Sequence, residues 1–164
     1  MSNTLQNVIW IGDSLSIGMT PVLAANLSAR ALVQHSPWDV HDGGAEETEY
    51  GLRCLNSFLH SPSGMELRGL DLIMFNWGMH DGPMSNRTTP GQNGPAVFYA
   101  TQLAQIADNL VAYSKSFPAG EQPQLLFVAT TPYLCDATSN GAVQSLNNVA
   151  EAIMSARGIP VVSS

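Results

Sequence analysis

The sequence predicts an α/β fold: a three-layer arrangement in which a five-stranded parallel sheet carries helices on both faces. Short apolar runs alternate five times with stretches of helical periodicity along the 164 residues, and this alternation is typical of strand–helix–strand units. Hydrophobic residues make up 45% of the chain and charged residues 12%, which is the composition of a compact globular protein. The length suits one domain, so we expect residues 1–164 to form a single domain.

The first strand and helix are marked by a change in periodicity near Gly12. Residues 8–11 (Val-Ile-Trp-Ile) form a continuous apolar run, as expected of a strand buried on both faces. A helix is predicted over 16–29, with Pro21 in its early part. Residues 31–34 give a second, weaker strand pattern.

The middle of the chain continues the alternation. Residues 70–75 are the clearest strand, and residues 82–95, with three prolines and three glycines, predict a loop. Apolar residues at helical spacing predict a helix on each side of this stretch: Leu52, Leu55, Phe58 and Leu59 before it, and Val97, Ala100, Leu103, Ile106, Ala107 and Leu110 after it.

The last elements are a strand, a helix and a short strand. Residues 125–129 predict the fourth strand, and residues 159–162 begin the fifth. Between them, a helix that ends near Gly158 is predicted from the spacing of Val143, Leu146, Val149, Ala150 and Ile153.

Charge and hydropathy exclude several classes of function. The net charge is −7 and the six basic residues are scattered, so we expect no nucleic-acid partner. No apolar run is long enough to span a membrane, and the polar residues 1–7 show no signal peptide. A cytoplasmic product, a processed secreted protein and a fragment all remain open. Cys54 and Cys135 lack metal-ligand spacing and are interpreted as two part-buried thiols or one disulfide.

Ligands of such sheets bind beyond the carboxyl ends of the strands, so the residues that follow each strand are the candidates for chemistry. Gly12-Asp13-Ser14-Leu15 follows the first strand, where the amides of the next helix would favour an anion such as a tetrahedral oxyanion. Asp and Ser are also ordinary helix caps.

Two further loops carry distinctive residues. His41-Asp42-Gly43-Gly44 follows the second strand, and paired glycines let the backbone approach a ligand closely, although a plain turn would look the same. Residues 76–81, Asn-Trp-Gly-Met-His-Asp, follow the third strand. Stability alone explains such a polar cluster poorly, although a cap or turn is the alternative.

Together these three blocks resemble the SGNH (GDSL-type) hydrolase family, whose sheet is flavodoxin-like. The resemblance implies that Ser14 is the nucleophile and that the amides of Ser14 and Gly44 form an oxyanion hole, with Gly43 as the alternative to Gly44. The family's Gly-x-Asn-Asp block corresponds to residues 78–81, which makes Gly78 and Asp81 supporting residues. Asp13 is expected to orient the turn around Ser14.

Two departures from the family pattern bear on activity. His80 stands where the family has the asparagine that donates to the oxyanion, and an imidazole N–H could serve that role with an altered pH dependence. The family's Asp-x-x-His block occurs nowhere in this sequence, so Ser14 lacks the expected base. We therefore expect a chain that is truncated at its C-terminus and inactive or severely impaired, with an active parent.

The resemblance implies a serine esterase that acts on an acetyl or short acyl ester of a carbohydrate or lipid and needs no cofactor or metal. A catalytically inactive binding module and an acyltransferase on the same fold are the alternatives. Other polar residues are given structural roles: His35 and His60 as solvated side chains, and Glu46, Glu47 and Glu49 at a helix start. Trp77 either lines a cleft or is buried, and a metal site from His41, Asp42 and Glu46 is disfavoured.

Overall fold

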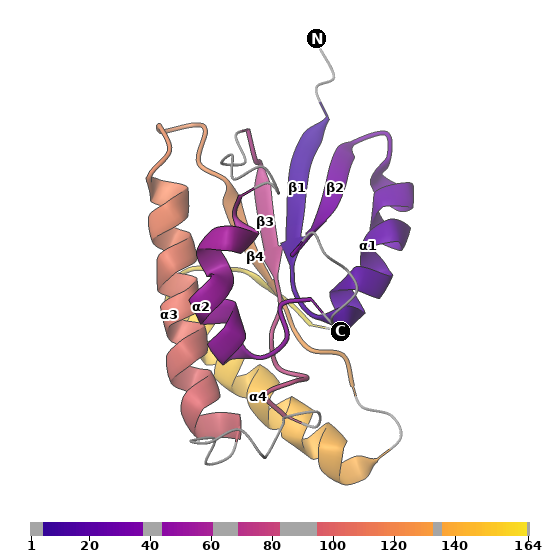
Figure 1. The fold of residues 1–164 in the computed structure, drawn as a ribbon, viewed down its shortest axis with the longest axis vertical. Coiled ribbons are helices and arrows are strands. Elements are labelled where there is room, and N and C mark those ends of the chain that lie inside the picture. Colours follow the sequence, from indigo (N-terminus) through magenta and orange to yellow (C-terminus); the bar gives the residue numbers. More distant parts are fainter. Residues whose placement is uncertain (1–4, 38–43, 61–68, 83–94, 133–135, 164) are drawn as a thin grey trace.

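The strands form one parallel sheet in the computed structural model, which describes residues 5–37, 44–60, 69–82, 95–132 and 136–163 (Figure 1). The strands are β1 (Gln6–Ile11), β2 (Ala31–Ser36), β3 (Leu72–Phe75), β4 (Gln124–Val128) and β5 (Val161–Val162), in the order β2-β1-β3-β4-β5. All four neighbouring pairs are parallel, so the predicted five-stranded parallel sheet is confirmed.

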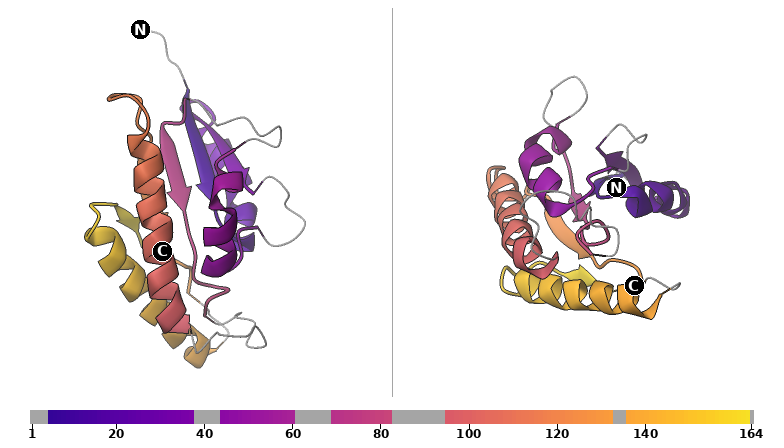
Figure 2. Two further views of the ribbon diagram at one scale, coloured as in Figure 1. Left: turned by 60° about the vertical axis from the view of Figure 1, so that its left-hand side comes forward. Right: turned by 60° about the horizontal axis from the view of Figure 1, so that its bottom comes forward.

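Four helices connect the strands and cover the two faces unequally. They are α1 (Ser14–Leu27), α2 (Thr48–Phe58), α3 (Pro95–Lys115) and α4 (Ala137–Ser155). Figure 2 shows α1 standing apart from the other three helices, on the opposite face of the sheet. The predicted α/β fold with helices on both faces is therefore confirmed.

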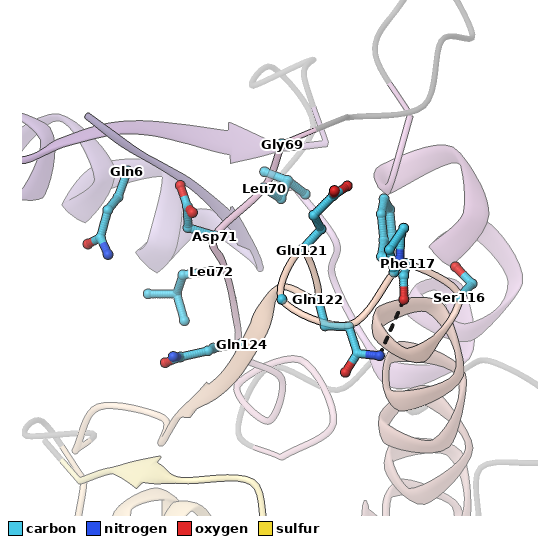
Figure 3. A pocket seen from close by; sticks show the side chains of 12 residues that line it. Gln6, Gly69, Leu70, Asp71, Leu72, Ser116, Phe117, Glu121, Gln122 and Gln124 are labelled. Atoms are coloured by element: carbon cyan, nitrogen blue, oxygen red, sulfur yellow. Dashed lines mark hydrogen bonds between the residues drawn. The ribbon is translucent and has the colours of Figure 1, made fainter. Parts of the chain in front are cut away.

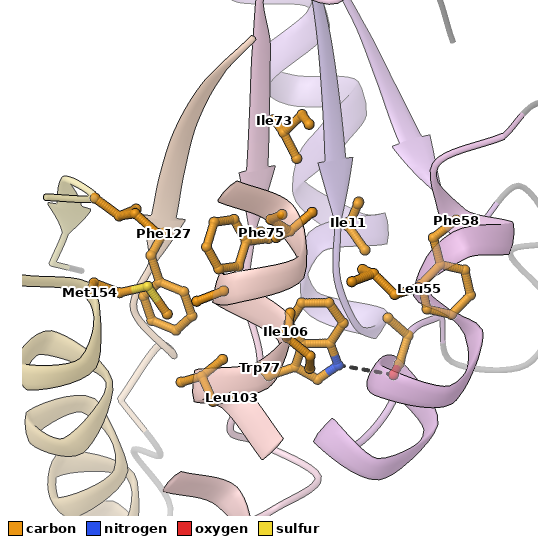
Figure 4. Packing of buried hydrophobic residues seen from close by; sticks show 14 of the residues in the cluster. Ile11, Leu55, Phe58, Ile73, Phe75, Trp77, Leu103, Ile106, Phe127 and Met154 are labelled. Carbon is orange, nitrogen blue, oxygen red and sulfur yellow. Dashed lines mark hydrogen bonds between the residues drawn. The ribbon is translucent and has the colours of Figure 1, made fainter. Parts of the chain in front are cut away.

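The main hydrophobic core lies between the sheet and α2, α3 and α4. Alternate side chains of β1, β3 and β4 point into it, because successive side chains of a strand face opposite sides. Figure 4 shows Phe75 and Phe127 of adjacent strands at its centre. Their ring centroids are 5.4 Å apart. The helices contribute the fully buried Leu103 and Ile106 of α3 and Met154 of α4.

A smaller apolar cluster lies on the other face, under α1. Its buried members are Val8 of β1 with Ala31 and Val33 of β2, and Leu23 and Leu27 of α1 pack on them. The side of α1 that is most buried is polar, since its buried residues are Ser16 and Thr20. This helix therefore turns hydroxyl groups toward the sheet, and one of them, on Ser16, takes part in the site described below.

The order of the strands places the candidate loops together at the carboxyl ends of β1, β2 and β3. From β1 the chain moves outward on one side to β2 and then crosses back to β3 on the other side. Ile11, at the end of β1, is in register with Ser36 of β2 and Phe75 of β3, so the three carboxyl ends are level. Ligand sites of open parallel sheets form at such a change of direction.

The element bounds differ from the sequence predictions by one or two residues: the first helix, predicted over 16–29, spans Ser14–Leu27, and each strand differs at one or both of its ends. The first helix begins at Ser14 because Asp13 caps it, and the last begins at Ala137 because the Asp136 side chain accepts from Thr138 N and Ser139 N. Most of the predicted loop 82–95 lies outside the described residues. Within the part of the chain that is described, no helix is long and apolar enough to cross a membrane.

Candidate active site

Ser14 is exposed at the start of α1, directly after β1. Asp13 precedes it with extended backbone, and its fully buried side chain accepts from Leu15 N at 3.0 Å through Oδ1. The capping carboxylate satisfies an N–H group that has no partner inside the helix. The turn thus holds Ser14 at the helix N-terminus, where the amides favour negative charge.

The second predicted loop lies against this turn. Gly44 forms an isolated antiparallel bridge with Asp13, and Ala45 N donates to the carbonyl of Gly12 at 2.8 Å. The φ angle of Gly44 is 82°, and a Cβ atom there would lie 2.4 Å from the Gly12 oxygen. Only glycine fits this approach. The alternative oxyanion residue Gly43, with His41 and Asp42, lies outside the described residues.

The third loop also contacts the turn, through Asn76. Its backbone N–H donates to the Ile11 carbonyl at 3.0 Å, and its Nδ2 lies 3.4 Å from Oδ1 of Asp13. Trp10 donates from Nε1 to Asn76 Oδ1 at 3.0 Å. A Cβ on Gly12 would lie 1.9 Å from that same Oδ1, so this glycine lets the two loops meet. Sequence reasoning had given Asn76 no individual role.

Trp77 and Gly78 fix the course of the third loop. Trp77 is fully buried, which settles the open alternative between burial and a cleft lining, and its Nε1 donates to the Ala45 carbonyl at 3.1 Å. Tyr99 of α3 donates to the Trp77 carbonyl at 2.9 Å. Gly78 packs so closely on Thr130 that a Cβ would lie 2.5 Å from its Oγ1. The second and third loops are therefore joined by a buried indole.

Asp81 is buried and caps α2 from the third loop. Both carboxyl oxygens accept from Thr48 N at 3.1 Å, and Thr48 Oγ1 lies 2.5 Å from Oδ1. Thr48 Oγ1 also lies 2.8 Å from Gln102 Oε1. Burial raises the pKa of Asp81 to about 6, which outweighs the opposing effect of the Thr48 hydrogen bonds. Asp81, for which a supporting role was predicted, thus connects the third loop to the first residue of α2.

His80 lies between Met79 and this cap. Its Nε2 is buried and has no hydrogen-bond partner among the described residues. A buried ring nitrogen without a partner loses its interaction with water and gains nothing in return, which is uncommon in folded proteins. The Oδ2 atom of Asp13 is unpartnered in the same way.

One polar pair in this region escaped the sequence analysis. His35 of β2 was expected to be solvated, and this was wrong: the ring is partly buried, with Nε2 2.7 Å from Ser16 Oγ and Nδ1 3.2 Å from the Pro37 carbonyl. Burial lowers the pKa of His35, against the raising effects of its backbone contacts and of Asp13. The two residues are 19 positions apart, and no local pattern links them.

The most voluminous of the described hollows lies elsewhere. This pocket encloses about 700 Å³ and lies at the amino ends of the strands, whereas Ser14 follows a carboxyl end. Figure 3 shows Gln6, Asp71, Glu121 and Gln124 around it. The chemistry of the three loops therefore does not depend on this hollow. No group of three potential metal ligands gathers among the residues whose positions are described.

The sequence matches no family model and no curated protein, but the fold is shared with solved enzymes. A protein of Agrobacterium tumefaciens assigned as an arylesterase aligns with 97% of this chain and 83% of its own, at a TM-score of 0.69 and 18% identity. A carbohydrate acetylesterase from Sinorhizobium meliloti aligns with 96% of this chain and 83% of its own, at a TM-score of 0.59 and 17% identity.

A GDSL-like lipase from Bacteroides thetaiotaomicron aligns with 99% of this chain and 72% of its own, at a TM-score of 0.59 and 14% identity. At such low identities these similarities concern the fold. The chain has the three-layer α/β architecture found in GDSL-type esterases and lipases.

Proposed function

We propose that this chain, with its GDSL-type fold, is an ester hydrolase domain in which Ser14 is the nucleophile. The observation that carries the proposal is the bridge between Asp13 and Gly44, two residues 31 apart. The bridge brings the backbone of Gly44 against the turn that carries the exposed serine, and the φ of 82° and the close Gly12 contact leave no room for a side chain.

The proposed reaction is acyl transfer through a covalent intermediate. The Ser14 oxygen attacks the ester carbonyl, whose π electrons move onto its oxygen. That oxyanion is stabilised by the amides of Ser14 and Gly44 and by an N–H of His80. Collapse of the intermediate expels the alcohol, which takes up the proton lost by Ser14, and water then releases the acid.

The unpartnered Nε2 of His80 supports its role as a donor to the oxyanion. Asp13, Gly78 and Asp81 would keep the loops in place rather than touch the substrate, and Gly43 remains the alternative to Gly44. No cofactor enters this mechanism. We propose an acetyl or short acyl ester of a carbohydrate or lipid as substrate, in line with the carbohydrate acetylesterase that shares the fold.

The proton acceptor for Ser14 is the incomplete part of this mechanism. The sequence contains no Asp-x-x-His, and His35 is held by the buried Ser16. An alcohol at its ordinary pKa is a weak nucleophile, so we expect slow turnover unless a base is supplied. This absence favours one alternative, a binding module on the same fold that does not turn over its ligand.

Labelling with a serine-directed fluorophosphonate, with and without added imidazole, tests the proposal. We expect modification of Ser14 that imidazole accelerates, because imidazole can take the serine proton. Ser14→Ala should abolish this labelling, and Ser145→Ala, on the exposed surface of α4, should leave it unchanged. Equal labelling of wild type and Ser14→Ala, or none even with imidazole, would favour the binding module.

A further inference from the structure

His35 is a partly buried residue of β2 whose ring faces the start of α1. It is in register with Trp10 of β1, and its ring reaches Ser16 in the first turn of α1. Ser16 is only 1% exposed, and its Oγ also lies 2.6 Å from the Asp13 carbonyl oxygen. Because Ser16 is closed off from solvent, this pair is not itself a nucleophile and its base.

Counting protons shows that these contacts cannot all be hydrogen bonds in a neutral network. The carbonyls of Pro37 and Asp13 only accept, and Ser16 has a single hydroxyl hydrogen. With a positively charged ring, Nδ1 donates to Pro37, Nε2 donates to Ser16, and Ser16 donates to Asp13. A neutral ring has two tautomers. With its proton on Nδ1, where it donates to Pro37, Ser16 must donate to Nε2, and the contact with Asp13 loses its hydrogen. With its proton on Nε2, the Ser16 bond to Asp13 remains and the Pro37 contact loses its hydrogen.

The Asp13 carbonyl keeps one partner in either state, because Ile17 N donates to it at 3.1 Å. The side chain of the same residue caps Leu15 and contacts Asn76, and its backbone bridges Gly44. A change in the Ser16 bond therefore acts on the residue that joins the three loops. Ser14 follows Asp13 directly.

We propose that His35 is a positioning residue for Ser14: its protonation selects whether the Ser16 hydroxyl is donated to the Asp13 carbonyl or to the imidazole. The inference rests on the function proposed for Ser14. Asp13 is the charged side chain whose field acts on His35 among the described residues, while β1 presents Trp10 and backbone. The cation favours the bond to Asp13, and the neutral ring that keeps its proton on Nδ1, toward Pro37, releases it.

Burial lowers the pKa of His35, so the change should occur on the acid side of the ordinary histidine range. NMR titration of the full chain can follow the His35 ring and the backbone amides of Ser14 and Leu15 together. In the wild type we expect the chemical shifts of these amides to change with pH at the same midpoint as the His35 ring. In Ser16→Ala the ring should still titrate, but the amide shifts at that midpoint should be lost.

His35→Gln offers a side chain that can donate or accept but does not titrate, so it should remove the midpoint from the amides. His35→Asn serves if the glutamine variant does not fold. Amides that ignore the ring in wild type, or that follow it equally in Ser16→Ala, would overturn the proposal.

The phosphonate reaction separates this inference from the proposed function. If Ser14 is the nucleophile, a plot of its labelling rate against pH should have an inflection at the titration midpoint of the His35 ring in the wild type. The same plot for His35→Gln should lack that inflection. Coupled amides without any labelling would count against the hydrolase and still support the link from His35 to the turn. Labelling of Ser14 without any coupling of the amides to the His35 ring would support the hydrolase and overturn the link from His35 to the turn.

Discussion

Gly44 is the residue on which the meeting of the first two loops depends most directly. Gly44→Ala would place a methyl group 2.4 Å from the Gly12 oxygen at a φ of 82°, so the loop must move away from Asp13. We expect a loss of about 1–3 kcal/mol in the free energy of unfolding, the range for strained backbone positions. Urea denaturation measures this loss, and Ser14 labelling should fall with it.

Gly18 is the matched control for this substitution. It lies in α1, four residues after Ser14, and a Cβ there would meet nothing within 4 Å. Gly18→Ala should therefore raise the free energy of unfolding by about 0.5–1 kcal/mol, because alanine is the better helix former. If both alanines changed stability alike, the close approach of Gly44 to Gly12 would not be a determinant of the fold.

At the scale of elements, α2 depends on a carboxyl group that lies outside it. The Asp81 carboxyl accepts a hydrogen bond from Thr48 N, whereas Glu47, the N-cap residue of the helix, makes no capping hydrogen bond with its side chain. Its pKa is raised from 3.8 to about 6, so between these values the folded chain binds more protons than the unfolded chain. The free energy of unfolding should therefore fall as pH rises through this window.

Asp81→Asn tests this pH dependence, because asparagine keeps an acceptor for Thr48 N and does not titrate. Between about pH 4 and pH 7, the wild type should lose up to about 3 kcal/mol relative to this variant, as follows from a shift of roughly two pKa units. Urea denaturation at several pH values measures the difference. Parallel pH curves for the two proteins would mean that the Asp81 pKa is not raised.

The same elements show how far sequence reasoning reaches. Strands β1 and β3 were predictable, because burial on both faces leaves a continuous apolar run in the local sequence, at 8–11 and at 72–75. The start of α2 was also predicted, from the acidic residues 46–49, but its cap was not, because the cap comes from Asp81, 33 residues away from Thr48. His35 was misjudged for the same reason, since its partner Ser16 is set by the packing of α1 on β2.

The three candidate loops were located correctly because parallel topology alone brings strand ends together. Their contact through Gly12, Gly44 and Asn76 depends on distances that no spacing in the sequence encodes. The roles assigned to Ser14 and His80 came from the resemblance to a family, and they stay predictions until the labelling experiment is done.

At the scale of the whole molecule, the frame that holds these loops is the core between the sheet and α2, α3 and α4. Phe127 is fully buried at its centre, and its ring packs against Phe75. Phe127→Ala should lower the free energy of unfolding by about 3–5 kcal/mol, since it removes a ring and leaves a cavity. Leu32→Ala is the control: Leu32 is 51% exposed, so we expect a change within about 0.5 kcal/mol.

Urea unfolding followed by far-UV circular dichroism measures both variants, and the slope of free energy against urea adds a second reading. Both hydrophobic clusters share β1 and β3, whose strands pair directly, so the molecule should unfold in one step. The slope for Phe127→Ala should then match the wild type, because the same surface is exposed on unfolding. A shallower slope or a second transition would show that α1 and its cluster unfold apart from the main core, and the Ser14 turn would then be held less firmly than the sheet.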